Sequence, residues 1–436
     1  MARGFAAVPR ARRFVLANAT VPAVLLYEPP TSADGDGLLA VDLTVADGAI
    51  ARIDPAGRRT RLPRLDLDRG MVWPCFVDMH THIDKGHIWP RRPNPDGTFD
   101  GALAAVAADR AGWDADDVAR RMAFSLRSAY AHGTALLRTH IDSQPPQHTT
   151  SWPVFSDMRA RWAGRVDLQG VSLFAIDAFL DEAYARDIVA TVARHKGVLG
   201  AVTFMIPGLD RVLRRLMAAA AEAGLDLDFH VDETGDPAAR SLGAIAEAAL
   251  ATGFPGTVVV GHCCSLAVQP DSAATVDKVA EAGLKVVSLP MCNFYLQDRA
   301  GARTPRWRGV TLVHELAARG IPVSVASDNT RDPFYAYGDL DMLEVFREAV
   351  RILHLDHPIA AWPAAVTRTP AAVLGRPDRG VIAVGAPADL VLFRARTFTE
   401  LLARPQADRT VLRSGRAIHR RLPDYRDLDD LMGGAP

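Results

Sequence analysis

Two histidines separated by a single residue, His80 and His82, come directly after an apolar run. On a strand, residues i and i+2 project to the same side, so two imidazoles at this spacing can bind one metal ion. Three other strand-like runs end in, or are followed by, a residue that can bind a metal: His230, His262 and Asp328. Three imidazoles and one carboxylate suit Zn²⁺ or Fe²⁺ and leave a position for water. The pattern therefore predicts a metal centre.

Glu233 lies three residues after His230, just beyond the end of the same apolar run. At that position a carboxylate can stand beside the metal without binding it. A water molecule that becomes a nucleophile loses a proton and the leaving group gains one, so a carboxylate in a partly desolvated pocket suits this transfer. We expect Glu233 to carry the proton, the alternative being a solvated loop acid. Asp84 is a candidate to orient the His82 ring.

The elements that must position these residues are short apolar runs, which alternate with longer Ala-rich segments between about residues 71 and 376. This alternation is typical of repeated βα units. Eight strands are predicted: Val72–Met79, Ala135–Thr139, Val166–Phe174, Val198–Phe204, Leu225–Phe229, Thr257–Gly261, Lys285–Leu289 and Pro322–Ala326. Eight βα units indicate an α/β fold of the (β/α)8 TIM-barrel class, whose catalytic residues lie at the carboxyl ends of the strands.

The two ends of the chain have a different pattern. Residues 1–70 and 380–436 contain short β-branched runs interrupted by Gly, Asp and Pro. We predict that these ends pair into one small β domain, beside a barrel domain of residues 71–379. Two unrelated flanking extensions are the alternative.

Composition narrows the class of protein. The chain has 436 residues, enough for one large barrel with an appended domain. Its 50 Lys and Arg residues balance 51 Asp and Glu residues, so no basic field is available to hold nucleic acid. The longest apolar runs are strand-length, far short of a membrane span. The four cysteines show no CxxC spacing, which argues against a disulfide framework and favours a reducing, cytoplasmic location.

Several motifs resemble the amidohydrolase superfamily: PCFVDMHTHIDK, FHVDE, VVVGHCCS, VSVASDNTRDPFYAYG and the closing GVIAVGAPADLVLF. Within that superfamily, RTHID at 138–142 and CNFYLQDR at 292–299 are similar to the cytosine deaminase branch, which is related to N-isopropylammelide amidohydrolase and other aminoheterocycle deaminases. The resemblance implies a TIM barrel with a β-sandwich built from both chain ends.

The resemblance also implies two groups of site residues. The metal ligands are His80, His82, His230 and Asp328. The catalytic residues are Glu233, His262 and Asp328. Many binuclear relatives have a carboxylated lysine at the end of the fourth strand, whereas here Lys196 precedes that strand. One divalent metal ion, zinc or iron, is therefore expected.

The implied reaction is hydrolytic deamination of an amino-substituted N-heterocycle with release of ammonia. Ala175 stands where cytosine deaminases have a Gln that pairs with the pyrimidine, and Asn329 stands where they have a second Asp. Because the amide contact is lost, we expect a substrate other than cytosine, of the pterin, creatinine, purine or triazine type. The residues expected to contact it are Ala175, Phe204, Asn329, Phe334 and Trp89.

Alternative functions stay open at this point. The chain could release an N-alkylamine, open a cyclic amide or imide, or be a metal-binding relative that has lost activity. HxxE at His230 to Glu233 and the absence of the fourth-strand lysine argue against ring opening. Members of the family are commonly oligomeric, so a homo-oligomer is expected, with a small heterocycle as its partner molecule.

Overall fold

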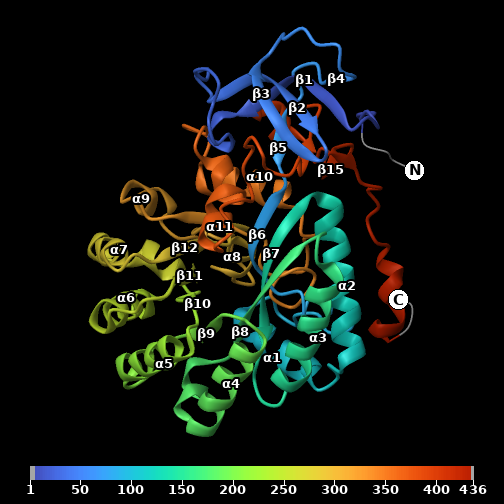
Figure 1. Ribbon diagram of the computed structural model, residues 1–436. Coiled ribbons are helices and arrows are strands. Elements are labelled where there is room, and N and C mark those ends of the chain that lie inside the picture. Colours follow the sequence, from blue (N-terminus) through green and yellow to red (C-terminus); the bar gives the residue numbers. More distant parts are fainter. Residues whose placement is uncertain (1–4, 434–436) are drawn as a thin grey trace. The chain divides into compact units, whose positions relative to one another are not determined.

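All eight predicted strands are present in the computed structural model, which describes residues 5–433 (Figure 1). Five of them form a parallel sheet in the order β13-β12-β11-β10-β9. Their bounds are Leu199–Thr203 for β9, Leu227–Val231 for β10, Val258–His262 for β11, Lys285–Ser288 for β12 and Val323–Val325 for β13. These strands are almost wholly buried, as expected of a parallel sheet, and this explains their unbroken Val-rich runs.

The other three strands form a second sheet in the order β6-β7-β8. Their bounds are Phe76–Thr81 for β6, Thr134–Asp142 for β7 and Asp167–Leu173 for β8. Parallel bridges join this sheet to the first at both edges. Val198 and Val202 donate backbone hydrogen bonds across the gap between β8 and β9, and Asp328 donates one to the carbonyl of His80 in β6. The carboxyl ends of β6 and β13 are thereby neighbours.

The bounds predicted for one strand are wrong. Val72–Met79 is two strands, β5 (Val72–Pro74) and β6, separated at Cys75. Pro74 has no backbone N–H to continue a ladder, and the N–H of Cys75 instead donates to the carbonyl of Asp389 at 2.9 Å. β5 pairs antiparallel with β14 (Leu390–Leu392) and so belongs to a different sheet from β6.

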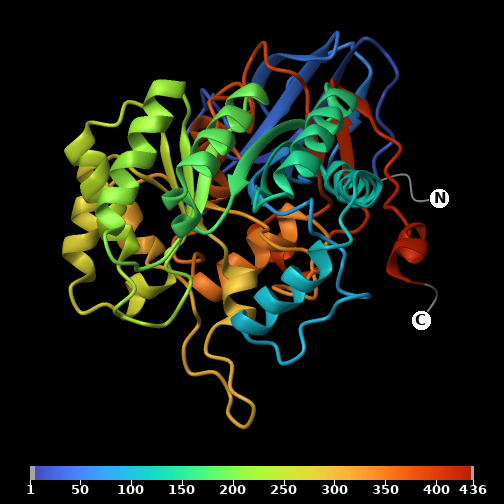
Figure 2. The same cartoon turned by 90° about the horizontal axis from the view of Figure 1, so that it is seen from below.

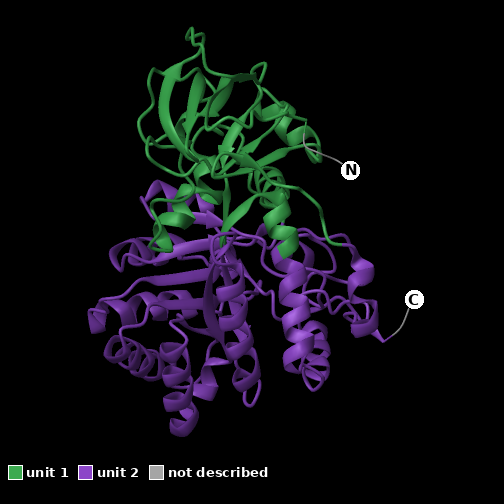
Figure 3. Cartoon of the chain, turned by 45° about the vertical axis from the view of Figure 1, so that its right-hand side comes forward, with its two compact units in different colours: residues 1–78, 127–136, 341–423 green, residues 79–126, 137–340, 424–436 purple. Residues whose placement is uncertain are grey.

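Two compact units make up the chain (Figure 3): unit 1 is 1–78, 127–136 and 341–423, and unit 2 is 79–126, 137–340 and 424–436. Unit 1 contains two four-stranded sheets, β3-β2-β1-β4 and β16-β15-β14-β5. Their remaining strands are β1 (Arg13–Pro22), β2 (Leu38–Ala46), β3 (Ala49–Pro55), β4 (Arg64–Asp66), β15 (Thr410–Arg413) and β16 (Arg416–Ala417). One apolar core contains residues of both chain ends, among them Leu16, Val41, Leu390 and Leu412.

Helices follow most strands of unit 2. On the outer side of β9 to β12 lie α5, α6 and α7, which form the left-hand flank in the view from below (Figures 1 and 2). In α5 the residues Leu209, Leu213 and Leu216 are buried at helical spacing, and Gly224 ends the helix in the left-handed conformation. Within residues 5–433 the α-helices are α1 (Phe99–Arg110), α2 (Ala115–His132), α3 (His148–Trp162), α4 (Glu182–Arg194), α5 (Leu209–Ala223), α6 (Ser241–Thr252), α7 (Ser272–Glu281), α8 (Pro290–Leu296), α9 (Val313–Ala318), α10 (Met342–Leu353), α11 (Arg368–Val373) and α12 (Phe398–Ala403).

None of the helices in residues 5–433 is long and apolar enough to cross a bilayer. All four cysteines are buried and free.

Candidate metal centre and active site

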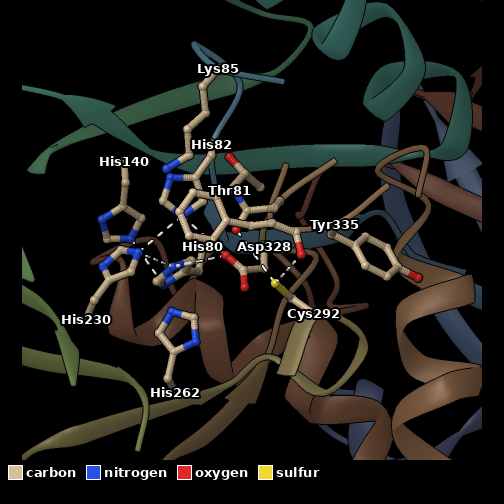
Figure 4. A network of polar contacts seen from close by, with 12 residues as sticks. His80, Thr81, His82, Lys85, His140, His230, His262, Cys292, Asp328 and Tyr335 are labelled. Carbon is tan, nitrogen blue, oxygen red and sulfur yellow. Dashed lines mark hydrogen bonds and ion pairs between the residues drawn. The ribbon is translucent and has the colours of Figure 1, made fainter. Parts of the chain in front are cut away.

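Three imidazole rings converge at the carboxyl ends of β6 and β10 (Figure 4). The Nε2 atom of His230 lies 3.1 Å from Nε2 of His80 and 3.1 Å from Nε2 of His82. All three side chains are buried. Burial keeps the pKa of each ring well below its usual value, so the rings are neutral. Each ring therefore has one nitrogen lone pair to offer.

Asp328 brings a carboxylate to the same point. Its Oδ1 atom lies 3.2 Å from Nε2 of His82 and 3.6 Å from Nε2 of His80. Asp328 comes shortly after β13, which ends at Val325, and its backbone is left-handed, with φ of 66°. Such a conformation costs about 1–3 kcal/mol in a residue with a side chain and persists where the surroundings impose it. In this conformation the Asp328 N–H donates to the His80 carbonyl at 2.9 Å.

The contacts among these rings fit a bound cation. A neutral imidazole nitrogen has either one hydrogen or one lone pair in the ring plane. The Nε2 atom of His230 therefore cannot make good hydrogen bonds to His80 and His82 at once. Two ligand nitrogens on one tetrahedral zinc ion lie about 3.3 Å apart, close to the observed separations. We conclude that His80, His82, His230 and Asp328 could hold one divalent metal ion.

A buried network supports His80 from behind. Nδ1 of His80 lies 3.1 Å from Nε2 of His140, and Nε2 of His140 is 3.9 Å from Asp228. Arg138 donates to Asp228 at 2.8 Å. Burial raises the pKa of Asp228 to about 6 despite Arg138. Because Nδ1 of His80 is occupied in this way, Nε2 is the atom directed toward the other rings.

Glu233 and His262 stand beside the cluster. Oε1 of Glu233 lies 3.3 Å from Nδ1 of His262, which is the last residue of β11. The backbone of His262 is left-handed, with φ of 67°. Next to Glu233, Asp232 accepts hydrogen bonds from the first backbone N–H groups of α6, at Ser241 and Leu242. This contact holds the turn that positions Glu233.

Burial, followed by the nearby Asp328 carboxylate, raises the pKa of Glu233 well above its usual value. Burial lowers the pKa of His262 to about 3. The pair at neutral pH is therefore a carboxyl group that tends to keep its proton and an imidazole that is neutral. Acid and base tasks are commonly divided in this way between neighbouring groups.

A cavity of about 240 Å³ opens above the cluster. Four of the predicted substrate-binding residues line it: Ala175, Phe204, Asn329 and Phe334. The fifth, Trp89, is not among the lining residues. The backbone N–H of Trp89, in the turn after β6, donates to the carbonyl of Arg331 at 2.9 Å. The Trp89 side chain is half-buried and lies outside the cavity lining. The structure thus brings together all the predicted site residues except Trp89.

One wall of the cavity is polar and was not predicted. It is formed by Lys85, Arg110, Asp142 and Gln144. Asp142 accepts a hydrogen bond from Arg110 at 2.8 Å and lies 3.6 Å from Nζ of Lys85. Lys85 and Asp142 belong to the motifs HIDK and RTHID. Membership of these motifs is the sequence signal from which both residues could have been predicted to lie at the site.

Asp84 does not orient His82 as expected. Its Oδ2 atom accepts a hydrogen bond from the backbone N–H of Asp142 at 2.7 Å. Burial, then the charge of Asp142, raises the pKa of Asp84 to about 7. Asp84 therefore connects the ends of β6 and β7 instead of contacting the ring.

A wider outer cavity of about 680 Å³ adjoins the inner one. The two share the lining residues Phe99, Leu103, Val202, Phe204, His230 and Glu233. The other wall of the inner cavity is apolar and includes Leu173 and Phe174. The inner cavity, called the slot below, therefore combines polar and apolar lining residues, includes the metal-ligand candidates His82 and His230 in its lining, and adjoins the wider outer cavity.

Comparison with known proteins agrees with this geometry. Residues 162–419 match the protein-family model described as "Amidohydrolase family". Pterin deaminase from Rhizobium rhizogenes (strain K84) is 58% identical over 439 residues, covering 99% of this chain and 100% of the relative. N-isopropylammelide isopropyl amidohydrolase from Pseudomonas sp. (strain ADP) is 23% identical, covering 86% of this chain and 93% of the relative.

The fold has counterparts among solved structures. The 5-methylcytosine deaminase from Klebsiella pneumoniae, solved with 5-fluorocytosine, superposes with a TM-score of 0.79 at 23% identity, covering 94% of this chain and 98% of that one. The resemblance found in the sequence motifs is confirmed, and the chain belongs to the amidohydrolase family.

Proposed function

We propose that this protein is a metal-dependent deaminase that hydrolyses the exocyclic amine of a pterin-type ring and releases ammonia. The observation that carries the proposal is the position of Glu233. Its protonation-prone carboxyl lies 3.3 Å from His262, beside the histidine and aspartate cluster and on the lining of the slot. An acid on the lining of a cavity that admits a heterocycle suits protonation of a ring nitrogen.

The metal site proposed here contains one divalent ion, zinc or iron, held by His80, His82, His230 and Asp328. Such an ion lowers the pKa of water and so supplies a nucleophile at neutral pH. The neutral state of the three rings favours ligation, because their lone pairs are free of protons.

The side chains then move protons in a balanced sequence. Asp328 accepts a proton from the attacking water, and His262 orients that water. Oxygen bonds to the ring carbon that bears the amine while Glu233 protonates the adjacent ring nitrogen. The proton held by Asp328 passes to the amine, the carbon–nitrogen bond breaks and ammonia leaves. As the carbonyl forms, the hydroxyl group on the ring carbon returns its proton to Glu233. The amidine and one water become a ring carbonyl with an N–H, and ammonia.

The choice of a pterin rests on two supports. The relative that is 58% identical over its whole length is a pterin deaminase. In addition, Ala175 leaves space in the slot at the position where a longer side chain would pair with a single pyrimidine ring. Aromatic side chains on the walls, such as Phe174 and Phe334, suit a flat bicyclic ring.

We also propose that β6 to β13 close into an eight-stranded barrel and that the chain ends build a β-sandwich. The bridges from Thr81 to Asp328 and from Val171 to Val198 support closure. The domain bounds proposed are 71–379 for the barrel and 1–70 with 380–436 for the sandwich, of which 1–4 and 434–436 lie outside the described residues. We also propose that the protein is a homo-oligomer, that it is located in the cytoplasm and that it does not bind nucleic acid.

Ammonia release tests the proposed reaction. Metal-loaded protein would be assayed with pterin, cytosine, guanine, creatinine, an aminotriazine and N-isopropylammelide. We expect turnover to be fastest with pterin, and Glu233→Gln to reduce it by about 10²- to 10⁴-fold. Glu222→Gln, which changes an exposed glutamate on α5 in the same way, should retain full activity.

Other outcomes would refute parts of the proposal. Cytosine turnover equal to that of pterin would contradict the substrate class. Release of isopropylamine, or ring opening without ammonia, would contradict the reaction. Full activity in Glu233→Gln would remove Glu233 from the mechanism.

A further inference from the structure

Asn293 makes two hydrogen bonds through a single nitrogen. Its Nδ2 atom lies 3.0 Å from Oε1 of Glu233 and 3.0 Å from Nδ1 of His262. The residue is buried in α8, on the segment that follows β12. It does not line the cavity. Asn293 therefore contacts both groups placed beside the metal cluster without facing the substrate.

The chemistry of an amide nitrogen determines the direction of both bonds. The NH₂ group has two hydrogens and accepts no hydrogen bond. Nδ1 of His262 must then be an acceptor without a proton, so the single proton of the ring lies on Nε2. The opposite amide orientation would place an oxygen of Asn293 3.0 Å from both atoms, and it would require a proton on Oε1 of Glu233 and on Nδ1 of His262 at the same time.

The other atoms of His262 are consistent with this assignment. Nε2 of His262 is buried and has no hydrogen-bond partner among residues 5–433. His262 lines the cavity. Its N–H is therefore available to a molecule bound there.

A second side chain on the same segment reinforces the arrangement. The backbone N–H of Gln297 donates to the carbonyl of Asn293 at 2.9 Å, and Nε2 of Gln297 donates to the carbonyl of Glu233 at 3.0 Å. Asn293 thus holds the carboxyl group of Glu233, while Gln297 holds its backbone. Only Asn293 also contacts His262.

We infer that Asn293 is a positioning residue that holds His262 in its Nε2-protonated form, so that His262 donates a hydrogen bond to the oxygen entering the ring. His262 in this form is a donor and does not take the proton of the attacking water. The inference rests on the proposed deaminase function for its catalytic meaning, whereas the tautomer itself is a property of the resting protein. A donor aimed at the oxygen that gains negative charge stabilises the transition state more than the ground state.

Nitrogen-15 NMR of histidine-labelled, zinc-loaded protein tests the tautomer directly. Protonated and unprotonated ring nitrogens have well-separated chemical shifts, and the His262 signals are assigned by their loss in His262→Gln. We expect a proton on Nε2 and none on Nδ1. In Asn293→Asp the new carboxylate can only accept, so the proton should move to Nδ1. Gln297→Ala, the matched control, should leave the His262 signals in place.

Kinetics give a second readout. Asn293→Asp and Asn293→Ala should each lower kcat by about 100-fold or more. KM should change by less than about threefold, because Asn293 does not contact the substrate. Metal content and thermal unfolding of each variant would be measured alongside. Gln297→Ala should lose much less activity than either Asn293 variant.

A proton on Nδ1 of His262 in the unmodified protein would overturn the inference, and this measurement requires no variant to fold. So would an Asn293→Asp variant that folds, binds metal and leaves both kcat and the His262 signals unchanged. Failure of the proposed function has a different signature. In that case no heterocycle releases ammonia, while the NMR experiment still determines the tautomer.

Discussion

Gly261 stands directly against the ring of His80. A Cβ atom on Gly261 would lie 2.9 Å from Cε1 and 3.1 Å from Nδ1 of His80. Both contacts are shorter than packed carbon atoms tolerate. The glycine before His262 is therefore what allows an imidazole from β6 to approach the end of β11.

The first prediction concerns this contact. Gly261→Ala should displace the His80 ring, because overpacking in a filled interior costs about 1–3 kcal/mol. We expect weaker metal binding, measured by competition with a chelator. The matched control is Gly243→Ala in α6, where a new Cβ meets no atom within 4 Å. That variant should keep its metal and gain stability, since Ala favours a helix interior. Equal metal affinity in the two variants would contradict the prediction.

Replacement of His140 should weaken the metal site from a distance. His140→Phe keeps a ring but removes the nitrogen that lies 3.1 Å from Nδ1 of His80. Loss of such a partner typically lowers metal affinity by about 10- to 100-fold. Zinc dissociation constants of the variant and the parent protein provide the test. His148→Phe, which changes a buried histidine in α3 that pairs with Asp187, should have no effect on zinc binding.

Removal of the metal should abolish activity and lower the melting temperature. The Nε2 atoms of His80 and His230 lie 3.1 Å apart and both side chains are buried, so solvent cannot take the place of the ion at their lone pairs. A ligand that binds only the native state stabilises it, and its loss reverses that effect. Chelation, dialysis and titration with zinc or ferrous iron would be followed by ammonia release and calorimetry. Full activity should return at one metal per chain, and a requirement for two would contradict the single-metal site.

Ala175→Gln should change the preferred substrate. The longer side chain would enter the 240 Å³ slot, obstruct a bicyclic ring and offer an amide to a pyrimidine. We expect kcat/KM for pterin to fall by about 10- to 100-fold and cytosine turnover to rise. Ala190→Gln on the exposed side of α4 is the control, since it adds the same side chain outside the cavity. Unchanged selectivity would show that residue 175 does not contact the substrate.

Unit 1 contains a buried ion pair that should account for most of its loss of stability at low pH. Asp341 accepts two hydrogen bonds from Arg409, at 2.6 and 2.7 Å, and Arg409 is almost completely buried. Burial alone would raise the pKa of Asp341, but the charges of Arg409 and His132 hold it well below its usual value. This ion pair stabilises the folded state at pH values above the unfolded-state pKa of Asp341, about 3.9. The stabilisation is lost as the pH falls through the folded-state pKa of Asp341.

Asp341→Asn should therefore destabilise the protein by about 3–5 kcal/mol at neutral pH, because it leaves Arg409 buried without its counter-charge. The difference from the parent protein should shrink below about pH 4. Urea unfolding at neutral and acid pH would measure both effects. Arg394→Ala breaks an exposed pair with Asp408 at a similar 2.7 Å separation and should cost less than about 1 kcal/mol. Equal losses in the two variants would refute the argument from burial.

The sequence was most informative where a side chain lies at the end of a strand. His80, His230 and His262 could be grouped in advance because the carboxyl ends of barrel strands meet on one face. The strand predictions succeeded for the same reason, since apolar runs of four to eight residues mark buried strands. The prediction failed at Pro74, where a local break in hydrogen bonding divides one apolar run between two sheets.

Residue types, their period and their order along the chain determined the α/β class, the family and the metal-binding candidates. Only the tertiary structure decided which atoms meet. Asn293 is 60 residues from Glu233 and 31 from His262, yet it bonds both, and Trp89 lies near the motif in sequence but outside the cavity. Periodicity reports which face of an element is buried. Contacts between elements depend on strand register and on loop conformations, which arise only when the whole core packs together.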